Sequence, residues 1–152
     1  MARIAYKSGY KYQLDAPYTC KVAVTPFKHV STKYIELSTR GELTIHAGYA
    51  WDGPSGPTID TKTFLRGSLV HDVLYQLMRD GWLMSTKWRE TADVELRRLC
   101  LEDGMWRIRA WWVYRGVRAG GKSSASVSNR KPVLYAPDDR SNDQDDWRDR
   151  TG

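Results

Sequence analysis

Hydrophobic and polar positions divide the chain into a strand-rich first part and a helical second part. Up to residue 47, apolar and polar side chains alternate in short runs rich in Tyr, Val and Thr, a pattern typical of β-strands. These runs lie at 10–14, 18–24, 34–37 and 42–47. The turn at 38–41 predicts that the last two runs form a hairpin. Residues 51–60 contain two Gly and two Pro, so we expect a shaped loop there.

Two helices are predicted after this loop, over 63–80 and 86–102, because apolar residues recur there at helical spacing. Gly81 is expected to end the first helix, and Ser85 or Thr86 to cap the second. The inward-facing residues that the spacing predicts are Phe64, Leu65, Leu69, Leu74, Tyr75 and Met78 in the first helix and Trp88, Leu96 and Leu99 in the second.

A third helix is predicted over 105–119, ending at the pair Gly120–Gly121. Its apolar stripe is expected to contain Met105, Ile108 and Trp112. Four arginines of the helix would carry charge on the other side: Arg107, Arg109, Arg115 and Arg118. Short connections between the three helices imply that neighbours pack antiparallel or crossed.

The predicted fold class is α+β, with a small N-terminal antiparallel sheet followed by a three-helix cluster. Residues 1–121 would form a single α+β domain, and 122–152 an extended connector with an acidic C-terminal tail. The net charge of +6 divides unevenly, because 138–152 carry −3 and 1–137 carry +9. The tail and the body therefore present opposite charges to a partner.

Composition excludes several classes of protein. Mean hydropathy is −0.62 and no apolar run approaches about eighteen residues, so no transmembrane segment is expected. The start of the chain lacks the apolar stretch of a secretory signal. Cys20 and Cys100 are eighty residues apart without a nearby partner, which argues against a disulfide framework and favours buried small apolar residues.

Candidate chemistry centres on the sequence HDVLY, from His71 to Tyr75. Tyr75 lies four residues after His71 and shares its helix face. Asp93 lies in the next helix, and in an antiparallel pair of helices it would accept a hydrogen bond from one nitrogen of His71, leaving the other as a base. In the structural alternative, His71 is a satisfied core residue, Asp72 is a helix surface charge, and Asp93 only staples two helices.

A Gly/Pro loop, an HDxxY helix and an Ala-Asp pair at 92–93 on the next helix resemble the phospholipase A2 arrangement, especially its disulfide-poor versions in bacteria and viral capsids. The resemblance implies that His71 activates a water and that Asp93, supported by Tyr75, orients the histidine. It also implies a Ca²⁺ ion bound by Asp72 and by the loop at 52–56, including Asp52 and Gly53. The loop departs from the usual glycine spacing of that family.

Over about residues 15–120, the chain is similar to a family of small tailed-phage and prophage proteins of unknown function (domain of unknown function 1353). The shared features are the N-terminal strands, the DGxSxP loop at 52–57, HDxLY, the Ala-Asp pair and an Arg/Trp-rich closing helix. This resemblance implies a phage protein made in the host cytoplasm, with the phage particle as a second location, and other phage structural proteins as partners. It implies no reaction.

The predicted function is therefore a phage protein, associated with the virion or its assembly, with a candidate calcium-assisted ester hydrolase site and a lipid substrate. The alternative is a non-enzymatic tail, neck or capsid component. The aromatic anchors for such a partner would be Trp106, Trp111, Trp112 and Trp147, because Trp, Tyr and Arg are favoured at protein interfaces.

Two further interpretations are less favoured. The basic body and its Trp/Arg helix would suit phosphate contact and base stacking, but no helix-turn-helix or RNA-binding motif is present, so we do not expect nucleic acid as the partner. The segment His46–Asp52 resembles the zinc segment of D-Ala-D-Ala peptidases, but the spacing is one residue short and the downstream Glu/His pair is missing.

Overall fold

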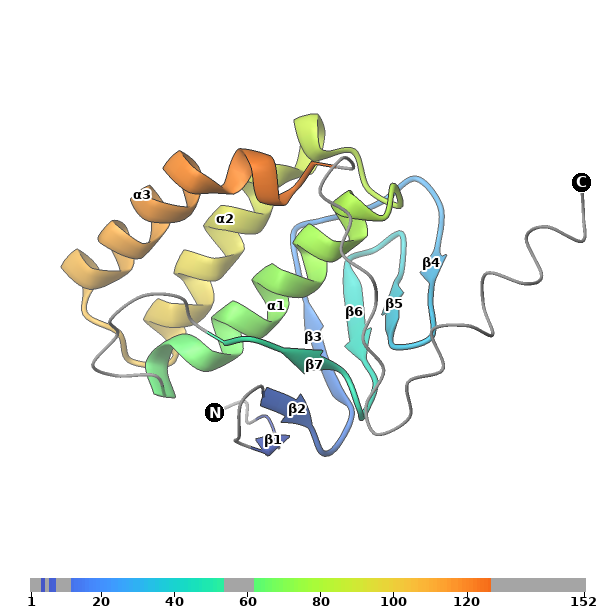
Figure 1. Cartoon of the computed structure of the whole chain (residues 1–152), viewed down its shortest axis with the longest axis horizontal. Coiled ribbons are helices and arrows are strands. Elements are labelled where there is room, and N and C mark those ends of the chain that lie inside the picture. Colours follow the sequence, from blue (N-terminus) through green and yellow to red (C-terminus); the bar gives the residue numbers. More distant parts are fainter. Residues whose placement is uncertain (1–3, 5, 8–11, 54–61, 127–152) are drawn as a thin grey trace, which may run out of the picture.

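The computed structural model describes residues 4, 6–7, 12–53 and 62–126 and confirms the α+β class (Figure 1). Its helices are α1 (Lys62–Arg79), α2 (Ser85–Glu102) and α3 (Arg107–Ser124). The strands are β1 (Tyr6–Lys7), β2 (Tyr12–Leu14), β3 (Tyr18–Lys21), β4 (Val30–Ser31), β5 (Ile35–Leu37), β6 (Glu42–Ile45) and β7 (Ala50–Trp51).

The described strands form two antiparallel sheets instead of one. The first has the order β1-β2-β7 and the second β3-β6-β5-β4. The predicted hairpin is confirmed: β5 pairs with β6, and Gly41 at φ +83° closes the turn while the Ser38 hydroxyl accepts hydrogen bonds from two following amides. The predicted loop 51–60 is wrong at its first residue, because Trp51 lies in β7 and pairs with Tyr12. Residues 54–60 lie outside the described residues.

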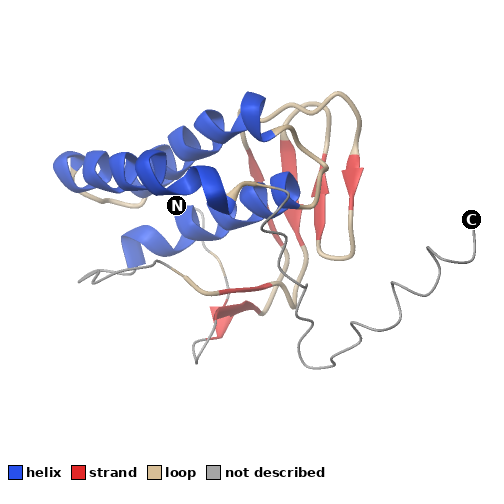
Figure 2. Cartoon of the chain, turned by 45° about the horizontal axis from the view of Figure 1, so that its top comes forward, coloured by secondary structure: helices blue, strands red, loops and turns tan. Residues whose placement is uncertain are grey.

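One hydrophobic cluster joins both sheets to α1, as the burial of Leu14, Ile45 and Leu74 illustrates. Figures 1 and 2 show α1 beside the strands, with α2 packed between α1 and α3. All six inward positions predicted for α1 are buried, and Leu96 and Leu99 of α2 are buried too. The cap prediction is wrong, because Met84 is the N-cap residue of α2 and makes no side-chain cap bond. No helix in the described ranges is long and apolar enough to cross a membrane.

The third helix differs most from its prediction. It begins at Arg107 and continues through Gly120 and Gly121 to Ser124, so the predicted connector begins too early. Of the predicted stripe only Met105 is buried, whereas Ile108 and Trp112 are 74% and 64% exposed. The inward residues are instead small or β-branched, and they let α3 approach its neighbours closely. They are Ala110, Val113, Val117 and Gly121.

Gly121 is needed for close packing and does not end the helix. A Cβ atom there would lie 2.3 Å from the Tyr75 hydroxyl, whereas a Cβ at Gly120 would meet nothing within 4 Å. Gly121→Ala is expected to lower the free energy of unfolding by about 1–3 kcal/mol through overpacking. Gly120→Ala is the matched control and should raise it by up to about 1 kcal/mol, because alanine favours helix. Urea unfolding of both variants measures the difference; equal stabilities would contradict this packing.

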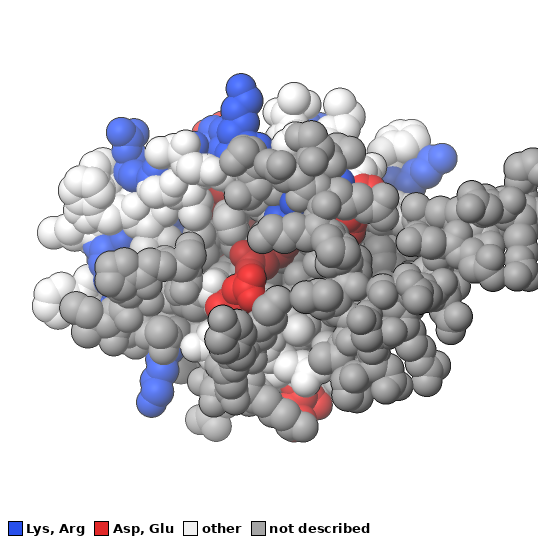
Figure 3. All heavy atoms as spheres, in the orientation of Figure 1, with Lys and Arg blue, Asp and Glu red and all other residues white. Residues whose placement is uncertain are grey.

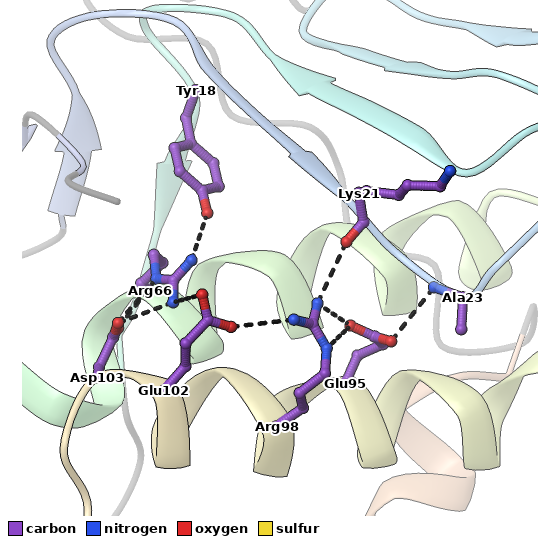
Figure 4. Close-up of polar contacts among 8 residues, drawn as sticks. All are labelled: Tyr18, Lys21, Ala23, Arg66, Glu95, Arg98, Glu102 and Asp103. Atoms are coloured by element: carbon purple, nitrogen blue, oxygen red, sulfur yellow. Dashed lines mark hydrogen bonds and ion pairs between the residues drawn. The ribbon is translucent and has the colours of Figure 1, made fainter. Parts of the chain in front are cut away.

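A buried arginine connects the second sheet to the helices (Figure 4). Arg66 of α1 donates to both carboxylate oxygens of Asp103 at 2.8–3.1 Å and to the Tyr18 hydroxyl of β3 at 3.0 Å. A neighbouring network joins α2 to β3, since Glu95 accepts from the Ala23 amide and Arg98 donates to the Lys21 carbonyl. These bonds fix α1 and α2 against the sheet and thereby position the residues described next.

Arg66→Lys is expected to lower the free energy of unfolding by about 1–3 kcal/mol, because an ammonium group cannot replace the planar fork that spans Asp103 and Tyr18. The exposed Arg40→Lys should change it by less than about 0.5 kcal/mol. Thermal and urea unfolding check both values. An Arg66→Lys variant as stable as Arg40→Lys would show that the hydrogen bonds of Arg66 to Asp103 and Tyr18 do not stabilise the fold.

Candidate active site

The structure brings together the three residues predicted as catalytic. His71 and Tyr75 lie one helical turn apart on α1, and their rings are 4.1 Å apart between centroids. Asp93 projects from α2 and is fully buried. The Asp93 Oδ1 atom accepts a hydrogen bond from His71 Nε2 at 2.7 Å and another from the Tyr75 hydroxyl at 2.6 Å. The bond to Asp93 therefore holds Nε2 in place, and the second ring nitrogen, Nδ1, faces away from Asp93.

Arg118 of α3 completes this group and was missed by the sequence analysis. Its Nη1 donates to Asp93 Oδ2 at 3.0 Å, and its own carbonyl accepts from Arg89 of α2 at 3.3 Å. The backbone of Gly121 lies against the Tyr75 hydroxyl from the same helix. The sequence gives no signal for this role, because it depends on how closely α3 packs against α2 through small residues such as Ala110.

The surroundings of His71 and Asp93 favour a protonated imidazole beside an ionised carboxylate. Burial opposes ionisation of Asp93, but hydrogen bonds from His71, Tyr75 and Arg118 outweigh burial and lower the pKa of its carboxyl. Burial likewise opposes protonation of His71, but the carboxylates of Asp72 and Asp93 outweigh it and raise the pKa of the imidazole. Burial and the adjacent Asp93 carboxylate raise the pKa of Tyr75, so its hydroxyl remains a donor. The histidine is thus a stronger base than a free imidazole.

The predicted metal ligand Asp72 lies on the Nδ1 side of the histidine. Its Oδ1 atom is 3.9 Å from His71 Nδ1, beyond hydrogen-bond distance, and its side chain is 39% exposed. Asp52 is exposed just after β7, and Gly53 adopts φ +77° with Tyr12 packed against it. The rest of the predicted loop lies outside the described residues.

The charges of Asp52 and Asp72 act on one common group. The hydroxyl of Tyr49 is buried and donates to Gln76 at 2.9 Å. Burial, then the charge of Asp72, and more weakly that of Asp52, raise the pKa of Tyr49. The described residues contain no group of three or more His, Cys, Asp or Glu side chains that could hold a metal ion. A metal at Asp72 would need main-chain carbonyls and water as well, which suit calcium better than zinc.

The predicted partner-binding tryptophans lie away from the core. Trp106, Trp111 and Trp112 are 84%, 42% and 64% exposed, and Trp111 and Trp112 contact each other edge to face at 5.0 Å. Trp147 lies outside the described residues. His46, in the segment similar to the peptidase zinc site, contacts Glu36 of β5 at 2.9 Å.

Comparison of the chain with protein-family models, with curated proteins and with solved structures finds no match.

Proposed function

We propose that this protein is an ester hydrolase in which His71 is the general base. The observation that carries the proposal is the 2.7 Å hydrogen bond between His71 Nε2 and the buried Asp93 carboxylate. The same carboxylate also accepts a hydrogen bond from the Tyr75 hydroxyl. A carboxylate that holds one ring nitrogen fixes the tautomer and leaves the other nitrogen to accept a proton. The side of the ring that carries Nδ1 also carries the half-exposed Asp72.

More specifically, we propose a phospholipase A2-like, calcium-assisted reaction on a phospholipid ester, in a tailed-phage protein. The order of the Gly53 loop, the His71–Tyr75 segment and Asp93 supports this choice, because it follows the order of that family. Asp72, Asp52 and the carbonyl of Gly53 would hold calcium, which would polarise the ester carbonyl when bound. We propose synthesis in the host cytoplasm and incorporation into the particle or its assembly intermediates.

In the proposed mechanism, His71 Nδ1 removes a proton from the water whose oxygen attacks the ester carbonyl carbon. The bond between that carbon and the alcohol oxygen then breaks, and Nδ1 returns the proton to the departing alcohol. The products are a fatty acid and a lysophospholipid. Asp93 and Tyr75 are positioning residues, because they keep the Nε2 proton in place while Nδ1 gains and loses its own.

The test is release of fatty acid from vesicles of phosphatidylglycerol and phosphatidylcholine by the full chain, in calcium and in a calcium chelator. His71→Ala provides the inactive reference. Release that requires both calcium and His71 supports the proposal. Equal release by wild type and variant, or no release by either, contradicts it and leaves the fold unaffected.

A second function is favoured by a different observation: Asp93 joins all three helices, through His71 and Tyr75 of α1 and Arg118 of α3. We propose as the alternative a structural virion component of the tail, neck or capsid, in which this group only staples the helices. Other phage structural proteins would then be the partners. No fatty acid release by the wild type, together with lower stability and weaker incorporation into particles for His71→Ala, would favour this alternative.

A further inference from the structure

The outward side of α3 carries large apolar side chains that the core does not use. Ile108, Trp111 and Trp112 recur at helical spacing and are exposed, and Trp106 precedes them at 84% exposure. The opposite side of the helix packs through small residues such as Ala110, which is fully buried. The exposed residues are therefore free of a packing role, and they form one surface, the outer α3 face, with Arg107, Arg115 and Lys122.

The outer α3 face is basic, and α3 contains no acidic residue that would neutralise its charge. No Asp or Glu occurs from 104 to 137, and α3 itself contains five Lys and Arg residues. Within the described ranges, no ion pair is formed by Arg107, Arg115 or Lys122; the guanidinium of Arg115 lies over the Trp111 ring at 5.6 Å. Figure 3 shows Lys and Arg atoms at several places on the margin, including the upper left where α3 lies in Figure 1, and the largest group of acidic atoms near the centre.

The same helix also reaches the candidate active site, through one residue at the edge of the outer face and one on the buried side. Arg118 bonds Asp93, and Gly121 packs on Tyr75. Because α3 is rigidly attached to the site residues, a surface that binds its outer face would be held at a fixed distance and orientation from His71. If the outer α3 face bound a lipid surface, His71 would therefore be held in a fixed position relative to that lipid.

We propose that the outer α3 face binds an anionic phospholipid surface. Tryptophan rings favour the headgroup level of a membrane, Ile108 would enter the acyl boundary, and basic side chains would pair with lipid phosphates. An amphipathic helix with Trp, aliphatic and Arg residues and no carboxylate has this combination of properties. The choice of lipid rests on the proposed function, whereas a protein or nucleic-acid partner would be an alternative outcome of the test.

The experiment is co-sedimentation of the full chain with vesicles, performed on the His71→Ala background so that no lipid is consumed. Vesicles contain either phosphatidylglycerol with phosphatidylcholine or phosphatidylcholine alone. We expect binding to the anionic vesicles that weakens with salt and falls by about tenfold or more for Arg115→Glu, since each basic residue near the surface contributes substantially. Trp112→Ala should weaken binding at every salt concentration.

Two matched controls keep the result specific. Arg40→Glu makes the same charge change at an exposed turn, and Phe27→Ala removes an apolar side chain that is 95% exposed elsewhere. Both should bind vesicles like the parent, and circular dichroism should show all variants folded. If Arg40→Glu weakened vesicle binding as much as Arg115→Glu, binding would depend on the net charge of the protein and not on the outer α3 face. That result would overturn the proposal.

Failure of this inference and failure of the proposed function are distinguishable. Absence of vesicle binding, with hydrolysis of a short-chain monomeric phospholipid retained, overturns the lipid-binding face alone. Binding without any hydrolysis overturns the hydrolase and supports the face. Single-stranded DNA binding that is lost in Arg115→Glu, without vesicle binding, would assign the face to nucleic acid instead.

Discussion

Replacing His71 with alanine is expected to lower the rate of the proposed phospholipid ester hydrolysis by about 10²- to 10⁴-fold, the usual contribution of a positioned general base. The reason is geometric: Nε2 is held by Asp93 at 2.7 Å, so Nδ1 alone can exchange a proton with water. Asp72 and Tyr75 remain in this variant, and neither replaces an imidazole that gains and loses a proton near neutral pH. Initial rates of fatty acid release at saturating calcium measure the effect.

The matched control is His46→Ala, because His46 is a partly exposed histidine that contacts Glu36 in the second sheet. Its rate should stay within about twofold of wild type. Wild-type activity at saturating calcium should increase as pH rises through the raised pKa of His71, above the ordinary value of about 6.5, because only the neutral imidazole accepts a proton. A His71→Ala rate within about threefold of wild type would exclude His71 as the base.

Local patterns explain which parts of the site were predictable. The apolar period of α1 fixes the shared face of His71 and Tyr75, and the short connection to α2 makes Asp93 a neighbour of that face. The α+β class follows in the same way from strand-like and helical periods. These features depend on residues close together in sequence, or on a helical pair with a short connection.

Non-local packing explains what the sequence analysis missed. The two-residue strands β1, β4 and β7 have no period of their own and exist only through pairing. In α3 small residues face the core and let the helix approach its neighbours closely, so its large apolar residues face outward. The close approach also brings Arg118 within hydrogen-bond distance of Asp93. Gly121 was predicted to end this helix, but its lack of a side chain instead accommodates Tyr75. Periodicity identifies an apolar stripe and does not show whether the core or a partner covers it.

Asp93→Ala is expected to lower the free energy of unfolding by about 3–5 kcal/mol, the usual cost of removing one partner of a buried ion pair. The carboxylate is fully buried and accepts three hydrogen bonds, so its loss leaves His71, Tyr75 and Arg118 without their acceptor. Asp93→Asn keeps the volume but places an amide against the Arg118 donor, and we expect a smaller loss. Glu90→Gln, an exposed change on the same helix, is the control and should stay within about 0.5 kcal/mol.

The stabilisation by Asp93 should depend on pH with a definite sign. Because the folded pKa of Asp93 is lowered, its contribution is present above the ordinary aspartate value of about 3.9 and is lost as pH falls through the folded pKa. Because the folded pKa of His71 is raised, the contribution of its protonated form is complete below about 6.5 and is lost as pH rises through the folded pKa. The stability difference between wild type and Asp93→Asn should therefore be largest between about pH 4 and 6.5. Urea unfolding across this range measures it, and a difference independent of pH would show that Asp93 contributes by shape rather than by charge.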